Sequence, residues 1–136
     1  MEEELLEVYR ELATTLDALL PVAWNRIYLY AEVEGERGSI DLSVLNKNSE
    51  LIALVDYPEW LEQEHDQHEW SDLPLYVQEL QTIFERYQEL EFTSFFFCLG
   101  SRGELGIEFG YQSFSDDYQL FRERMGSFID KYAEEV

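Results

Sequence analysis

The sequence predicts an α+β protein that forms a single domain over residues 1–136, in which helices pack on an antiparallel sheet. Three stretches place apolar residues three and four positions apart, which is the spacing of one buried helix face. Five others alternate apolar and polar residues or are continuously apolar, as strands are. Their positions give the order α-β-β-β-α-β-β-α, and 136 residues suffice for one core.

The first helix is predicted from the N-terminus to Leu20. Glutamates at positions 2–4 favour its first turn, because carboxylates are stabilised near the positive end of the helix dipole. Pro21 ends the helix, since proline lacks the amide hydrogen that would continue it. The apolar face consists of Leu5, Tyr9, Leu12, Leu16 and Leu19.

A meander of three antiparallel strands is predicted next. From Arg26 to Glu34 the period is two, which places alternate side chains on opposite faces of a strand. A turn at 35–38 leads to a second strand over 40–44, and a turn at 46–49 leads to a third over 51–55. One face of the first strand carries Ile27, Leu29, Ala31 and Val33, and the other carries Tyr28, Tyr30, Glu32 and Glu34.

The middle of the chain is predicted to be a polar loop followed by a second helix. Residues 57–71 are rich in acids and show no regular apolar period. Ser71 or Asp72 caps the helix, which has Pro74 in its first turn and runs to about Leu90.

The C-terminal part is predicted to be a hairpin and a last helix. Strands over 93–99 and 105–111 flank a turn at 100–103. Asp116 or Asp117 caps the last helix, whose apolar positions continue to Tyr132.

Net charge is the most unusual property of the chain. Nine Lys and Arg oppose 30 Asp and Glu, which gives a net charge of −21 and a pI near 4.1. Such a field repels phosphates and anionic membranes and attracts basic proteins. We therefore expect no nucleic acid and no membrane as partners, and a basic protein is favoured. The alternative is that the charge serves solubility alone.

The chain is expected to reside in the cytoplasm. Its first residues are acidic, unlike a signal peptide, and no stretch approaches the roughly 18 apolar residues of a membrane span. The single cysteine, Cys98, lies in an apolar run and cannot form an internal disulfide, which fits a reducing compartment.

No catalytic residues, metal site or cofactor are predicted. His65 and His68 lie among carboxylates and offer the nitrogen and oxygen ligands of divalent ions. A closed zinc site needs further ligands, and the chain has no other histidine. The serines also lack the G-x-S-x-G context of a nucleophile. A metal-dependent enzyme that uses these histidines is retained only as a third hypothesis.

Partner binding is predicted for two kinds of side chain. Asp and Glu are poor strand and core residues, so the carboxylates of strands and loops are expected at the surface. Aromatic residues at strand edges or in the loop either anchor a partner or cover the second face of the sheet; these are Trp24, Tyr28, Tyr30, Trp60 and Trp70. The predicted contact residues are Glu32, Glu34, Asp41, Trp60, Glu62, Glu64, Asp66, Glu69, Trp70, Asp116 and Asp117.

Several segments resemble a known family. A Pro-x-x-Trp-x-x-Ile-Tyr-x-Tyr-Ala block occupies residues 21–31, preceded by Leu-Glu-Val-Tyr-Arg-Glu-Leu-Ala at 6–13. Phe-Thr-Ser-Phe-Phe-Phe at 92–97 and Gly-Glu-Leu-Gly-Ile-Glu-Phe-Gly-Tyr at 103–111 extend the likeness over most of the chain. The sequence thereby resembles the YezG-type immunity (antitoxin) proteins of bacteria. The resemblance implies binding and neutralisation of a secreted nuclease toxin.

Together these features favour an immunity protein that blocks a cognate toxin, a basic nuclease, by stoichiometric binding without a cofactor. The alternative is an acidic adaptor or regulatory protein that binds a basic cellular protein. A toxin gene beside the gene for this chain would distinguish the two. The oligomeric state does not follow from the sequence.

Overall fold

A computed structural model describes residues 1–20, 23–34, 37–56, 58–62, 69–111 and 118–133. It confirms the α+β class and the order α-β-β-β-α-β-β-α, with two short 3₁₀ helices, η1 and η2, between the third strand and the second helix. The elements are α1 (Glu2–Leu19), β1 (Trp24–Glu34), β2 (Arg37–Asn46), β3 (Leu51–Ala53), η1 (Leu54–Asp56), η2 (Pro58–Glu62), α2 (Asp72–Arg86), β4 (Ser94–Gly100), β5 (Leu105–Gly110) and α3 (Tyr118–Ala133).

All five strands belong to one antiparallel sheet in the order β3-β2-β1-β4-β5. The predicted meander β1-β2-β3 and the predicted hairpin β4-β5 are both present. They join through β1 and β4, where Leu29 lies opposite Phe97. β1 and β4 therefore lie inside the sheet, and all seven residues of β4 are buried.

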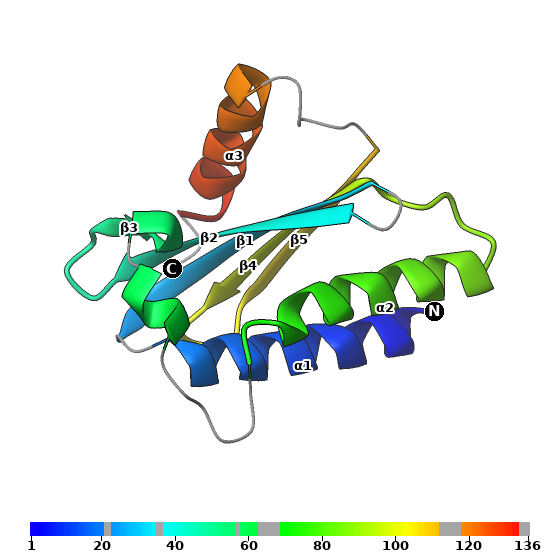
Figure 1. Ribbon diagram of the computed structural model, residues 1–136, viewed down its shortest axis with the longest axis horizontal. Helices are drawn as coiled ribbons and strands as arrows, with labels where there is room; N and C mark the ends of the chain where they lie inside the picture. Colours follow the sequence, from blue (N-terminus) through cyan, green and yellow to red (C-terminus); the bar gives the residue numbers. More distant parts are fainter. Residues whose placement is uncertain (21–22, 35–36, 57, 63–68, 112–117, 134–136) are drawn as a thin grey trace.

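The sheet is the middle of three layers. Helices α1 and α2 lie side by side on one face, and α3 lies on the other (Figure 1). Alternation of side chains along each strand sends one set toward each helix layer. The larger core lies on the face of α1 and α2 and includes Leu12 and Leu16 of α1, Val77, Leu80 and Phe84 of α2, Ile27, Leu29 and Ala31 of β1, and Phe95, Phe97 and Leu99 of β4.

A smaller aromatic core lies under α3. Tyr28 and Tyr30 are each 1% exposed and pack with Met125 and Phe128 of the helix. The hypothesis that these two tyrosines cover the second face of the sheet is therefore confirmed. Helix α3 approaches the sheet closely at Gly106, where a Cβ atom would lie 2.4 Å from the Tyr132 ring.

The ends of two elements, the third strand and the second helix, differ from the sequence prediction. The third strand ends at Ala53 and not at residue 55, because the chain turns into η1. Helix α2 ends at Arg86 and not near Leu90. Gln88 there has a φ of 57°, and the amides of Gln88 and Glu89 bond to the carbonyls of Glu85 and Phe84, which is the Schellman pattern of a helix end. The predicted caps Asp116 and Asp117 lie outside the described residues.

Candidate functional site

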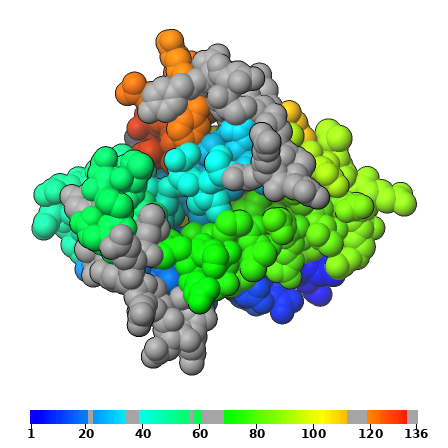
Figure 2. Space-filling model, viewed as in Figure 1, coloured from blue at the N-terminus to red at the C-terminus, as the bar shows by residue number. Residues whose placement is uncertain are grey.

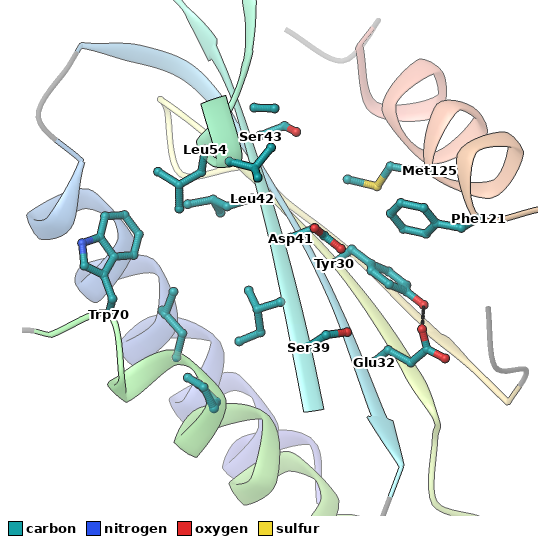
Figure 3. A pocket seen from close by; sticks show the side chains of 15 residues that line it. Tyr30, Glu32, Ser39, Asp41, Leu42, Ser43, Leu54, Trp70, Phe121 and Met125 are labelled. Carbon is teal, nitrogen blue, oxygen red and sulfur yellow. Dashed lines mark hydrogen bonds between the residues drawn. The ribbon is translucent and has the colours of Figure 1, made fainter. Parts of the chain in front are cut away.

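A hollow of about 720 Å³ opens along β2, between η1 and the start of α2 on one side and α3 on the other. On the face shown in Figure 2, cyan residues of β2 reach the surface between green α2 and orange α3. Figure 3 shows Trp70 and Leu54 on one side of β2, and Phe121 and Met125 on the other. The lining residues are Tyr30, Glu32, Ser39, Ile40, Asp41, Leu42, Ser43, Ala53, Leu54, Val55, Trp70, Leu73, Pro74, Phe121 and Met125.

The α3 side of this hollow is acidic. Asp41 lies opposite Tyr30 in the ladder of β1 and β2, and Glu32 is two residues further along the same face of β1. The Tyr30 hydroxyl donates a hydrogen bond to Glu32 Oε2 over 3.0 Å (Figure 3). The ring of Phe121 in α3 packs on Tyr30, with 4.7 Å between the two ring centroids.

Glu32 corrects one prediction. The strand carboxylates were expected at the surface, but Glu32 is only 9% exposed. The alternation of β1 predicted that Glu32 lies on the sheet face away from the larger core. It did not indicate that α3 packs on that face. Asp41 is exposed as expected. For Glu34 the structure describes only the backbone, which belongs to β1.

These neighbours shift the acid–base behaviour of the site. Burial, followed by the hydrogen bond and negative charge of Glu32, raises the pKa of Tyr30 well above its usual value. Partial burial of the Asp41 carboxyl group raises its pKa, and the negative charge of Glu32 adds to the effect. Ionisation of this site is therefore unfavourable in free energy. A cation bound in the hollow would reduce that cost.

The two loop tryptophans have different positions. Trp70 is half-buried and lines the hollow, and its indole Nε1 donates to the Trp60 carbonyl over 3.1 Å. Trp60 is 8% exposed and packs in the larger core, contrary to the surface position expected of a partner anchor. Residues 58–62 form η2, and this turn directs the indole of Trp60 inward. Trp24 is also half-buried and donates to Asp17 Oδ1 over 3.2 Å.

The predicted loop acids are only partly described. Glu69 is exposed beside the start of α2, and its side chain accepts a hydrogen bond from the Ser71 hydroxyl. Glu62 ends η2, and only its backbone is described. Glu64, Asp66, Asp116 and Asp117 lie outside the described residues. The structure thus brings together Glu32, Asp41 and Trp70 from three separate segments, and places Glu69 next to the last of these.

Several residues of the hollow were not predicted as functional. Ser39 and Ile40 come from the strand that carries Asp41, while Phe121 and Met125 come from α3. Val55, which is 81% exposed, was assigned to the third strand. The Asp56-to-Pro58 break just after it was a signal that the strand ends earlier. No local pattern indicated that α3 would reach β2.

The histidines, the cysteine and the helices bear on the other hypotheses. Among the described residues, no three His, Cys, Asp or Glu side chains come together as metal ligands would, and His65 and His68 lie outside those residues. Cys98 is buried in β4, as its apolar neighbours predicted. None of the described helices is both long and apolar enough to pass through a membrane.

Comparison with known proteins agrees with the resemblance seen in the sequence. A family model described as "Immunity protein YezG-like" matches residues 5–134. The type VII secretion system protein EsaG of Staphylococcus aureus is 25% identical over 116 residues, a stretch that covers 81% of this chain and 69% of EsaG. The family match spans both hairpins and all three helices, including the segments that surround the hollow. The chain therefore belongs to the YezG-like family of immunity proteins.

Proposed function

We propose that this protein binds one cognate secreted toxin in a stoichiometric complex and neutralises it in the cytoplasm of the producing cell. The observation that carries the proposal is the family match over residues 5–134. The similar protein EsaG is named as part of a type VII secretion system, so a toxin exported by such a system is the natural partner to test first. The protein acts by occupying the toxin and needs no catalysis and no cofactor.

The toxin is a basic nuclease in this proposal, and the charge of the chain supplies the physical reason. A nuclease must hold a polyanion, so its active-site cleft carries Lys and Arg side chains. A partner with a net charge of −21 is drawn to such a surface. Electrostatic steering of this kind raises association rates by roughly 10- to 1000-fold and weakens as salt is added.

The contact surface centres on the acidic hollow. Glu32, Asp41 and Trp70 lie there together, and Glu69 adjoins them. The carboxylates make this surface negatively charged, while the half-buried Trp70 offers contact area at low entropic cost. The remaining predicted contact residues are Glu34, Glu62, Glu64, Asp66, Asp116 and Asp117. Trp60 contributes by supporting Trp70 through its carbonyl.

The decisive experiment pairs the protein with the product of the toxin gene adjacent to its own gene. Co-expression should restore growth, and the two purified proteins should form a 1:1 complex. Titration should abolish cleavage of DNA or RNA at one equivalent. A toxin that binds but proves to lack nuclease activity would refute the nuclease assignment alone. Absence of any complex, with growth unrescued, would refute the immunity function.

Two sets of variants that replace carboxylates with amides locate the contact with the toxin. One set neutralises the hollow through Glu32→Gln and Asp41→Asn. The other neutralises the loop with Glu62→Gln, Glu64→Gln, Asp66→Asn and Glu69→Gln. The set that touches the toxin should weaken binding and flatten its salt dependence more than the other, because a contact charge loses more than a distant one. Unchanged binding by both would exclude these acids from the interface.

A further inference from the structure

The hollow follows the edge of β2 and does not lie on one face of the sheet. Five consecutive residues, Ser39 to Ser43, all line it. Successive side chains of a strand point to opposite faces, so one cavity touches all five only by wrapping around the strand's outer side. Figure 3 shows this arrangement, with side chains of the hollow on both sides of the β2 ribbon.

The outer side of β2 is only partly paired. Strand β3 pairs with Ser43, Val44 and Leu45 and then turns away into η1. β2 itself continues to Arg37 and pairs with β1 along its inner side. No described residue forms a ladder with the outer side of β2 between Arg37 and Leu42. Every second residue of that stretch turns its amide and carbonyl outward, where they offer hydrogen bonds to an added strand.

The two sides of the hollow differ in chemistry. On the face of α1 and α2, Ile40 and Leu42 lie beside Trp70 and Leu73, which form an apolar wall. On the α3 face, Asp41 and Glu32 provide carboxylates, flanked by serines at positions 39 and 43. An added strand would send alternate side chains to these two walls, so it needs apolar residues on one face and cationic residues on the other.

We propose that the outer edge of β2 accepts an extended segment of the toxin as an additional strand, whose residues alternate between apolar and basic. This inference rests on the proposed function and names the way in which the partner docks. Backbone hydrogen bonds to β2 give affinity, the wall of Trp70 and Leu73 takes the apolar side chains, and Asp41 and Glu32 take the cations.

Charge selects this occupant over a second copy of the same chain. Two copies paired through β2 would bring two molecules of charge −21 together, with Asp41 of each at the shared edge. Like charges at close range in a partly buried site are costly. A basic strand would be attracted electrostatically to this edge, whereas a second acidic copy would be repelled.

Hydrogen–deuterium exchange on the 1:1 complex of the unmodified protein with the adjacent-gene toxin tests the pairing directly. Outward-facing amides of β2 between residues 37 and 42 should become protected when the toxin is bound. A 1:1 complex that leaves these amides unchanged, or protects only the opposite edge strand β5, would overturn the docking mode while leaving the immunity function intact. If no complex forms at all, both the function and this inference fail.

A charge variant tests the cationic face of the added strand. Asp41→Lys should weaken toxin binding by roughly 10- to 100-fold, since it places a cation where the toxin brings one. The matched control is Glu79→Lys, an exposed acid on α2 outside the hollow that gives the same change in net charge. Equal losses for the two variants would show that only the overall field matters and would refute a specific contact at Asp41.

Discussion

Replacing Gly106 with alanine tests how α3 is held on the sheet, which matters because α3 supplies one wall of the hollow. A Cβ atom at Gly106 would lie 2.4 Å from Tyr132 Cε1 and 2.6 Å from two further ring atoms. Ordinary van der Waals contact begins near 3.4 Å, so the ring must retreat by about 1 Å. Tyr132 in turn packs edge-on against Phe128, with 4.8 Å between ring centroids.

The expected cost follows from this crowding. Overpacking a fitted site costs about 1–3 kcal/mol. Alanine recovers roughly 0.5–1 kcal/mol of that by restricting the unfolded chain. At the middle of these ranges, Gly106→Ala should lower the free energy of unfolding by about 1 kcal/mol. For a chain of this size, the melting temperature should fall by roughly 3–5 °C. Thermal and urea unfolding, followed by circular dichroism, measure both quantities.

Two controls make the result specific to the contact. Gly126, inside α3, has no atom within 4 Å of an added Cβ, so Gly126→Ala should stabilise the protein by about 0.5–1 kcal/mol. In a Tyr132→Ala background the clash at Gly106 is gone, and Gly106→Ala should then be neutral or stabilising. If Gly106→Ala is neutral in the unmodified chain while Gly126→Ala behaves as stated, Tyr132 does not pack on β5 and the reasoning is wrong.

Two further predictions concern the site and the core. Asp41→Asn should stabilise the protein near pH 7 but not near pH 3, because the raised pKa of Asp41 means that stability is lost as pH rises from the ordinary Asp value through the raised one. Urea unfolding at both pH values measures this difference in stability. Glu79 is an exposed acid, and if Glu79→Gln stabilised the protein equally, the gain would come from the change in net charge alone. Leu12→Ala, at a position with 0% exposure in the larger core, should cost about 2–5 kcal/mol by the same measurement. A loss below about 1 kcal/mol would contradict the packing of α1 on the sheet.

The candidate site was predictable only in pieces. Glu32, Asp41 and Trp70 were identified as contact residues from their residue types and their positions in strands and loop. That they line one hollow depends on β2 lying between α2 and α3. Trp60 was placed wrongly, because residue type alone does not tell an anchor from a core tryptophan. A loop position therefore indicates where a partner can bind but does not establish exposure.

The sequence by itself determined the α+β class, the order of the elements and the face on which most strand residues lie. Local periodicity carries this information, since spacings of two and of three to four residues report which side chains share a face. The tertiary structure alone decided the pairing of β1 with β4, the covering of Tyr28 and Tyr30 by α3, and the short reach of β3, which pairs with the outer side of β2 only at residues 43–45 among the described residues. Each of these joins segments far apart in the chain. A face that periodicity identifies as apolar or polar does not reveal which distant segment will cover it.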